Sequence, residues 1–529
     1  MTRRKEAARV DRSSWKTLLL ASVPLAVLAA GFALRIYHLG ESSVWIDEAN
    51  TVRIARMGFA DMIGALSRDS SPPLYYLLLR SWMFLLGEGP IAIRLLSVLF
   101  GVILIGSVFV VGRRFFSYRT GVVAAILMAV APAQILHSQQ CRMYTLLPLL
   151  ALGAWHCLRN AADTGSRAWV AGWIACMIAA VYTHHYGWFL FPACLWILWS
   201  HGELRRRPMR WIGAAAMIGV AYLPWSPFFW QQLHISAQNS WYQPIWDALG
   251  PQGDLLATLD SFSGGRRSLS FAWAEPDAFR IPRLLLLVAT SAWALFRIFR
   301  RDGDPGTKRN AGDVLAFLMI PLIALITISM VASPVYRFGR SDQLVFPAFI
   351  LLTAACVTAF RRPAVVVALT AFLAMFSLAN YPPVTVHASM RSSADVAGTI
   401  LGLARPGDAV LSTSLTAGPL EYYARQAGVR LPIITFPRDD IGHPAIQDQA
   451  AWLATPGALE HEAGAAVDDA CRAAGPGGRF FAVLGIEAFN RPLLRALARR
   501  DGSRLVILPG ERRIPVTSTP VRLLVVTCA

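Results

Sequence analysis

The sequence predicts an α-helical membrane protein with many spans and a small α/β domain at its C-terminal end. Of its 529 residues, 55% are hydrophobic and only 16% are charged, whereas soluble domains carry about 25% charged residues. Long apolar runs recur up to residue 380, and after them short apolar strands alternate with more polar helices. We therefore expect a membrane domain over residues 1–384 and a soluble α/β domain over residues 385–529.

About eleven apolar runs are candidates for transmembrane helices, because roughly 20 apolar residues are needed to cross a bilayer. One further run, 72–87, is ambiguous because it is short, begins with two prolines and carries Arg80 in its middle. The eleven runs cover residues 17–37, 90–111, 121–136, 144–158, 168–182, 187–200, 211–225, 281–298, 312–332, 343–360 and 363–380.

The distribution of basic residues decides how to read the run 72–87. The net charge is +18, and the Lys and Arg residues cluster between apolar runs, a pattern that fixes topology at the cytoplasmic surface and does not indicate nucleic-acid binding. If 72–87 lies along the interface, the N-terminus and every dense basic cluster between spans fall on the cytoplasmic side. If 72–87 crosses the membrane, all the later basic clusters fall on the outer side, against the positive-inside rule. We therefore predict an interfacial helix there and an extracytoplasmic C-terminal domain.

The C-terminal region reads as alternating strands and helices. Strands are expected within 408–414, 429–436, 479–486 and 503–510, and helices within 420–428, 448–474 and 491–500. Seven cysteines are scattered without a CxxC pair, and only Cys471 and Cys528 fall in this domain. They would be able to pair in an oxidising compartment, and the sequence leaves that pairing open.

The unusual polar residues of the membrane domain gather in the loops that this topology places outside. Polar groups at membrane depth are expensive and usually functional. In SVWIDEAN, Asp47 and Glu48 are adjacent carboxylates behind a Trp. One reading is a solvated helix cap, and the other is a catalytic carboxylate that takes a proton from an attacking hydroxyl.

Four further residues suggest a phosphate site. Arg142 and Tyr144 lie in HSQQCRMY, and Arg337 and Arg340 lie in YRFGRSDQ. Arginine binds phosphate through paired N–H donors, and a Tyr hydroxyl adds another donor. The plainer alternative is an Arg that extends to the interface beside an interfacial Tyr.

His184 and Asp69 are weaker candidates. His184, in YTHHYG, is either a ligand or an ordinary hydrogen-bonded histidine, and Asp69, in RDSSPPLYY, is either a helix N-cap or a contact to a sugar hydroxyl. Neither motif identifies a metal, so the need for a divalent ion stays open.

Taken in order, these motifs resemble the GT-C membrane glycosyltransferases, in the branch of the dolichyl-phosphate-mannose protein mannosyltransferases and the lipid A aminoarabinose transferase. The resemblance covers roughly residues 40–350. Three departures are Gln140, Ser71 and Leu96, where relatives usually have Glu, His and Pro; the first weakens any shared metal site. The matching pieces are Trp45, Asp47 and Glu48; Asp69 and Pro72 to Tyr76; Arg94 and Ser97; the GRRFF segment; Ser138, Arg142 and Tyr144; Tyr182 to His184; and Arg340 with Pro347.

The resemblance implies transfer of a sugar from a polyprenyl-phosphate donor to a lipid, glycan or protein acceptor, with inversion at the anomeric carbon. It places the reaction on the outer face of a bacterial inner (plasma) membrane. Asp47 and Glu48 would be the catalytic residues: Asp47 would be the general base or would orient the acceptor, and Glu48 would position Asp47 or a nearby Arg. The remaining roles are donor-phosphate binding for Arg142, Tyr144, Arg340 and Arg337, and weaker substrate contacts for Asp69, Tyr75 and His184.

Two other functions compete with this reading. A lipid-linked sugar flippase or other transporter would carry charged residues in the middle of spans and often shows paired half-repeats, and neither is found here. A scaffold built around the C-terminal domain would leave the shared outer position of Asp47, Arg142 and Arg340 without explanation. The sequence therefore favours the enzyme and predicts no nucleic-acid partner.

Overall fold

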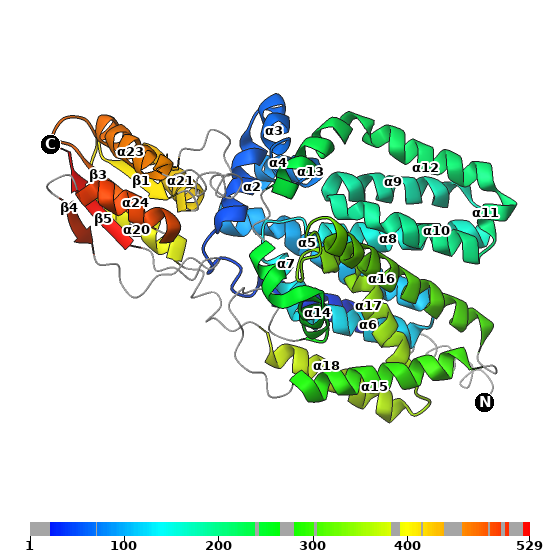
Figure 1. Cartoon of the computed structure of the whole chain (residues 1–529). Helices are drawn as coiled ribbons and strands as arrows, with labels where there is room; N and C mark the ends of the chain where they lie inside the picture. Colours follow the sequence, from blue (N-terminus) through cyan, green and yellow to red (C-terminus); the bar gives the residue numbers. More distant parts are fainter. Residues whose placement is uncertain are drawn as a thin grey trace, which may run out of the picture.

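The structure, a computed structural model, consists of a helical membrane domain and a C-terminal α/β domain. The helical domain lies on the right in Figure 1, the α/β domain on the left, and helices α2 to α4 between them. The residues it describes are 22–69, 71–238, 243–264, 280–300, 304–381, 392–413, 416–437, 457–484, 487–498, 503–506 and 522–528.

Each predicted apolar run is helical over most of its described residues, whereas Tyr144 and Thr145 of the run 144–158 lie in a turn before α8. Residues 17–21 of the first run lie outside the described residues. Among the described helices, four are long and apolar enough to cross a membrane, and a bent pair makes a fifth. The polytopic helical fold is thus confirmed, whereas the number of about eleven spans stays a prediction that depends on shorter helices. The helices are Ser22–Ile36, α5 (Pro90–Phe115), α6 (Tyr118–Val130), α7 (Pro132–Ser138), α8 (Leu146–Thr164), α9 (Arg167–Thr183), η1 (His185–Phe189), α10 (Leu190–Ser200), α11 (Glu203–Arg206), α12 (Pro208–Tyr222), η2 (Leu223–Trp225), α13 (Ser226–Gln238), α14 (Gln243–Phe262), α15 (Arg280–Phe299), α16 (Pro305–Val331), η4 (Ser341–Val345), α17 (Phe346–Thr358) and α18 (Pro363–Ala379).

The run 121–136 is broken into α6 and α7, which meet at an angle of 61°. Pro132 begins α7, and because proline has no N–H it leaves a carbonyl of the preceding turn without its helical partner. The fully buried Arg35 occupies this position: its Nη2 donates to the carbonyl of Met128 at 3.1 Å and its Nη1 to that of Ala129 at 3.0 Å. A charged side chain from the first helix therefore satisfies the break.

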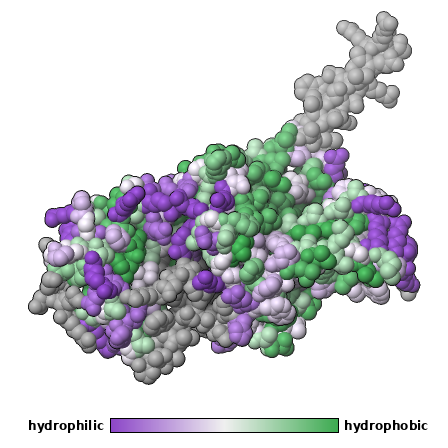
Figure 2. Space-filling view, turned by 90° about the horizontal axis from the view of Figure 1, so that it is seen from above, coloured by the Kyte–Doolittle hydropathy of each residue, from purple (hydrophilic) through white to green (hydrophobic). Residues whose placement is uncertain are grey.

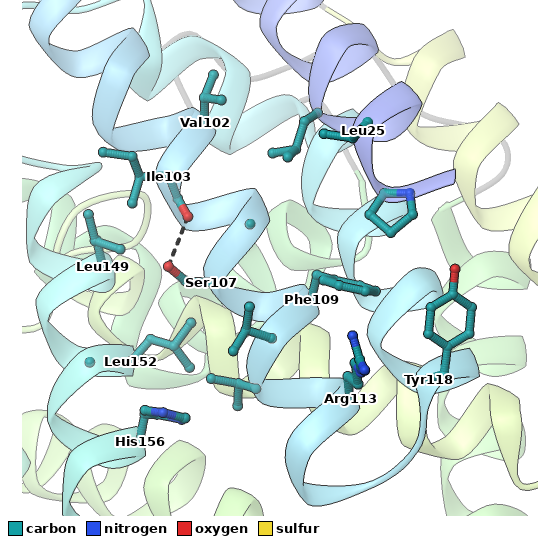
Figure 3. Close-up of a pocket in the computed structure, with 16 residues that line it drawn as sticks. Leu25, Val102, Ile103, Ser107, Phe109, Arg113, Tyr118, Leu149, Leu152 and His156 are labelled. Carbon is teal, nitrogen blue, oxygen red and sulfur yellow. Dashed lines mark hydrogen bonds between the residues drawn. The ribbon is translucent and has the colours of Figure 1, made fainter. Parts of the chain in front are cut away.

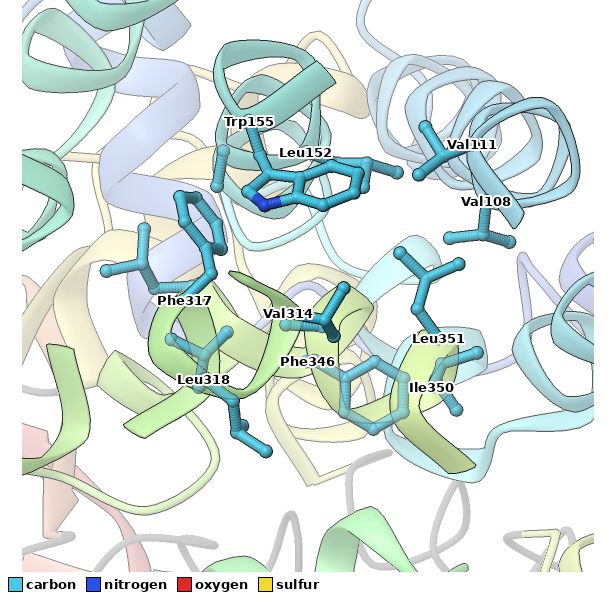
Figure 4. Packing of buried hydrophobic residues seen from close by; sticks show 14 of the residues in the cluster. Val108, Val111, Leu152, Trp155, Val314, Phe317, Leu318, Phe346, Ile350 and Leu351 are labelled. Atoms are coloured by element: carbon cyan, nitrogen blue, oxygen red, sulfur yellow. The ribbon is translucent and has the colours of Figure 1, made fainter. Parts of the chain in front are cut away.

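The membrane domain has a continuous apolar interior and an apolar exterior. Inside, Trp155 of α8 faces Phe317 of α16, and Leu351 of α17 lies near Val108 of α5 (Figure 4). Outside, large side chains such as those on α12 and α15 are exposed, as expected for residues that face lipid. Figure 2 shows this surface as a green band over the helical part with purple residues at its far end.

Three helices, α2 (Ile46–Arg56), α3 (Phe59–Leu66) and α4 (Leu74–Leu86), form a layer between the two domains. The 13 residues of α4 extend over about 20 Å, which is too short for a hydrocarbon core of about 30 Å. Its C-terminal end exposes Phe84, Leu85 and Leu86. These features agree with the predicted interfacial helix.

The C-terminal domain is a five-stranded sheet in the order β2-β1-β3-β5-β4. Strand β1 is parallel to β2 and β3, whereas β5 is antiparallel to β3 and β4; in register, Val410 lies opposite Ile433 and Phe481. The first four strands fall in the predicted segments, and β5 was not predicted. The elements are α20 (Ser392–Leu403), β1 (Ala409–Thr413), α21 (Ala417–Gln426), β2 (Ile433–Phe436), α23 (Ala458–Ala474), β3 (Arg479–Leu484), α24 (Glu487–Ala498), β4 (Ser503–Val506) and β5 (Arg522–Thr527).

Helices cover both faces of this sheet because neighbouring strand residues point to opposite sides. Val410 and Phe481 pack with α20 and α21, whereas Leu411 and Phe480 pack with α23 and α24. The predicted boundary at residues 384 and 385, and residues 448–456 of a predicted helix, lie outside the described residues.

The C-terminal domain contacts the segment that leads into α2. The hydroxyl of Tyr423 accepts a hydrogen bond from the Val44 N–H at 2.7 Å, and the Ala394 N–H donates to Ser43 Oγ at 3.1 Å. Ile46 of α2 is part of the buried cluster that contains β1 and α23. The α/β domain therefore packs against the start of α2 and the segment before it.

Cys471 and Cys528 form a disulfide that joins the end of α23 to the end of β5. Replacing both with Ser should destabilise the C-terminal domain by about 2–4 kcal/mol, because the cross-link restricts a 57-residue separation in the unfolded chain. Limited proteolysis at rising temperature would measure the loss. Dithiothreitol should reproduce it in the unmutated protein and change nothing in the double variant; equal stability of both proteins would contradict the prediction.

Candidate active site

The two carboxylates in the first turn of α2, Asp47 and Glu48, point in different directions. Glu48 is fully buried and accepts hydrogen bonds from Arg94 of α5, Nε to Oε1 at 2.8 Å and Nη2 to Oε2 at 2.7 Å. Its Oε1 also accepts from the Cys141 N–H at 2.8 Å. Glu48 thus joins α2, α5 and the loop 139–145.

Arg94 completes the connection through backbone carbonyls. Its Nη1 donates to Leu39 and Ser42, and its Nη2 to Ser43, at 2.9 to 3.0 Å. Every N–H direction of the guanidinium is therefore used by protein, which a buried charge requires. The segment 39–43 and the start of α2 are fixed together as a result.

Asp47, by contrast, faces a basic cluster. Its side chain is 13% exposed, and its Oδ2 lies 3.4 Å from Nη2 of Arg340. The Asp47 carbonyl accepts from the Thr51 hydroxyl at 2.6 Å, and Arg142 Nη1 donates to that same hydroxyl at 2.8 Å. Asp47 and Arg340 thus meet although they are 293 positions apart in the chain.

Arg142 and Arg340 share the ring of Tyr144. Each guanidinium carbon lies 5.9 Å from the ring centroid, within range of a cation–π interaction. Arg142 is only 9% exposed and Tyr144 only 4%. Two cations held this close in a poorly solvated place favour an anion, and phosphate matches the donors of both.

The turn that carries Arg337 and Arg340 is held by the buried Asp342. Oδ2 of Asp342 accepts from the Gly339 N–H and from the Thr258 hydroxyl of α14, both at 2.8 Å. Gly339 has φ +72°, a left-handed conformation that favours glycine. Helix α14 therefore helps to fix the position of both arginines.

His184 lies near this basic cluster. Its ring stacks on that of Tyr186 with 4.0 Å between centroids. Burial, followed by the charges of His185, Arg142 and the 337–340 turn, lowers the pKa of His184 well below its usual range. It is therefore a neutral side chain near pH 7. His185 is turned away, with Nε2 2.8 Å from Oε1 of Gln232.

Asp69 and Tyr75 occupy supporting positions. Asp69 Oδ2 accepts from the Tyr76 hydroxyl at 3.2 Å; the N-cap interpretation of Asp69 is wrong, because Pro73 precedes α4. Tyr75 is fully buried, and its hydroxyl lies 3.0 Å from Ser97 Oγ, which donates to the Arg142 carbonyl at 3.1 Å. Tyr75 thus supports the Arg142 backbone.

The structure therefore brings Asp47, Arg142, Tyr144 and Arg340 together and places His184 beside them, while Glu48 points into the protein. Two residues that contribute to the site, Arg94 and Thr51, were given no role in the sequence analysis. Arg94 was noted only within a motif, although a lone Arg at the start of an apolar run is a signal for a buried partner. Thr51 gave no signal. Among the described residues, no three His, Cys, Asp or Glu side chains gather as a metal site.

Comparison with known proteins bears on the family and the fold. Residues 70–228 match the family model of dolichyl-phosphate-mannose-protein mannosyltransferases. No curated protein matches the chain by sequence.

Two solved structures share the fold. ArnT from Cupriavidus metallidurans bound to undecaprenyl phosphate is 16% identical, with 97% of this chain and 98% of that chain covered and a TM-score of 0.56. An oligosaccharyltransferase from Archaeoglobus fulgidus tethered to an acceptor peptide is 14% identical, with 94% and 74% covered and a TM-score of 0.55. The resemblance of the motifs to the GT-C membrane glycosyltransferases is confirmed as a resemblance, by the family match over residues 70–228 and by the fold shared along the chain.

Replacing Glu48 with Gln should destabilise the protein by roughly 3–5 kcal/mol, because it leaves the buried guanidinium of Arg94 without its counter-charge. Thermal unfolding of the purified protein would measure the change, with Asp47→Asn as the matched neighbour. Asp47→Asn should unfold close to the unmutated protein, since Asp47 is partly exposed. An equal loss in both variants would contradict the division between a structural Glu48 and an accessible Asp47.

Proposed function

We propose that the protein transfers a sugar from a polyprenyl-phosphate donor to a hydroxyl of a lipid, glycan or protein acceptor. The observation that carries the proposal is the position of the Asp47 carboxylate, 3.4 Å from Arg340 and beside the Arg142–Tyr144 pair. A base and an anion site then lie next to each other, as transfer from a phosphate leaving group requires. The undecaprenyl phosphate bound to the ArnT structure supports a donor of this class.

In the proposed reaction, Asp47 accepts the proton of the acceptor hydroxyl while its oxygen attacks the anomeric carbon. The bond from that carbon to the donor phosphate breaks, and the electron pair leaves with polyprenyl phosphate. Attack from the side opposite the leaving group inverts the anomeric carbon. Arg142, Arg340 and the Tyr144 hydroxyl stabilise the charge that grows on the departing phosphate.

Other residues hold this machinery. Glu48 and Arg94 fix the first turn of α2, so that Asp47 is presented at the surface of the site. Arg337 adds positive charge next to Arg340, and the neutral His184 offers a hydrogen bond without a charge. Asp69 and Tyr75 support the site from behind through Tyr76 and Ser97.

The reaction is assigned to the extracytoplasmic face of a bacterial inner membrane. The basic clusters between apolar runs lie at the end of the helices opposite Asp47, which by the positive-inside rule is the cytoplasmic end. The disulfide between Cys471 and Cys528 fits an oxidising compartment for the C-terminal domain.

Among the described residues, the broken helix pair α6–α7 is the feature that favours a transporter, because discontinuous helices often form transport sites. Here the carbonyls of Met128 and Ala129 at the break are already occupied by Arg35. The break is therefore filled by the protein, and the transferase remains the better-supported function.

Asp47→Asn should lower sugar transfer about 10²- to 10⁴-fold, because it removes the proton acceptor and keeps the size of the side chain. The assay is transfer from a panel of radiolabelled polyprenyl-phosphate sugars by purified protein in membranes. Asp61→Asn, at an exposed acid on α3, is the matched control and should keep full activity. Normal transfer by Asp47→Asn would remove it from the mechanism, and movement of a donor across vesicles without transfer would favour the flippase.

Arg142→Lys and Arg340→Lys should each lower the transfer rate about 10²-fold or more, because a lysine cannot make the paired contacts of a guanidinium with a departing phosphate. Initial rates at saturating donor would show the effect, and Arg68→Lys, an exposed residue between α3 and α4, is the control. Unchanged rates in both variants would place the donor phosphate elsewhere.

A further inference from the structure

A groove of about 1000 Å³ lies on the membrane domain, away from the site around Asp47. It is bounded by the helix Ser22–Ile36, α5, the start of α6, and α8. Its volume is at the upper end of the roughly 300–1,000 Å³ typical of ligand sites. A space of this size is large enough for one or more alkyl chains.

The two ends of the groove differ in chemistry. Figure 3 places Val102 and Leu25 at the top and Arg113 and His156 at the bottom, with Tyr118 also toward the lower part. The apolar end has no charged residue in its lining, whereas the other end has a guanidinium, an imidazole and a phenol. An amphipathic molecule with an anionic head matches this arrangement.

The groove reaches the membrane surface opposite the active site. Helix α5 begins near Arg94, which contacts Glu48, and ends with Arg113, Arg114 and Phe115. Its 26 residues extend over about 39 Å at about 1.5 Å per residue, close to the thickness of a bilayer with its headgroup regions. Arg113 and Arg114 are exposed, and within the described residues neither has an ion-pair partner.

We propose that this groove binds an anionic phospholipid of the leaflet opposite the active site, with an acyl chain between α5 and α8 and the phosphate at Arg113. Charge complementarity selects the occupant, because the polar end offers cationic and neutral donors and no carboxylate. Naming this leaflet cytoplasmic rests on the orientation given with the proposed function; the binding itself does not depend on sugar transfer.

The test is photo-crosslinking of the purified full-length protein with phosphatidylglycerol that carries a diazirine on its acyl chain, followed by peptide mapping. Crosslinks are expected within residues 102–113 and 149–156. Phosphatidylglycerol should compete better than phosphatidylcholine, and Arg113→Gln should reduce that preference about five-fold, the effect of one basic residue near a membrane surface. The control Arg361→Gln with Arg362→Gln changes two exposed residues on the same side of the membrane in this topology and should leave the preference unchanged.

A second variant tests the apolar part. A side chain added at Gly106 would project toward Leu28, 3.8 Å from its nearest atom, so Gly106→Leu fills the groove without changing charge and should abolish the mapped crosslinks. Equal competition by both lipids, or crosslinks unaffected by Gly106→Leu, would overturn the proposal in favour of ordinary surrounding lipid. If the crosslinks are absent and a mass measurement shows a dimer, the groove would be assigned to contact with a second copy of the chain, and the lipid proposal would be overturned. Because the readout is binding, loss of transfer in other variants does not affect it.

Discussion

The ion pair between Glu48 and Arg94 is the interaction on which the end of the membrane domain next to the C-terminal domain depends. Both side chains are buried, and their partners come from α2, α5, the segment 39–43 and the Cys141 backbone. A buried pair contributes little net stability by itself, yet removal of one partner leaves a charge that nothing else compensates. Its effect is to fix one geometry, and Asp47, one residue before Glu48, takes its direction from it.

A second constraint is the repulsion between Arg142 and Arg340. Both guanidinium groups lie over Tyr144, and their charges would drive them apart if the supporting loops were loose. Asp342 fixes one loop and the Ser97 hydroxyl fixes the other, while Asp47 offsets part of the charge. The supporting loops thus keep two positive charges close together, and this fixed arrangement is what the proposed binding of a donor phosphate requires.

The sequence predicted what depends on local pattern. Apolar runs became helices because their periodicity and length are local properties. The site around Asp47 was predicted only by combining charge topology with the order of motifs, since contact across 293 residues has no local signal. The sequence did not predict that Glu48 points into the protein, because adjacent Asp and Glu residues have the same chemistry and only tertiary packing determines which one is buried. Strand β5 was not predicted, because the short apolar segment at the end of the sequence does not by itself indicate a strand. Its pairing with β3 and β4 is apparent only in the folded sheet.

The position of Arg35 bears on how the chain is assembled. Its two carbonyl partners, in Met128 and Ala129, are synthesised 93 and 94 residues after it. During insertion the first helix therefore carries a guanidinium whose permanent partners do not yet exist, and it must rely on water or lipid headgroups until α6 and α7 arrive. The bent pair in turn exposes its free carbonyls until it meets that helix. Correct assembly of the membrane domain thus requires the first helix to meet the bent pair, because the guanidinium supplies the donors and the bend supplies the acceptors.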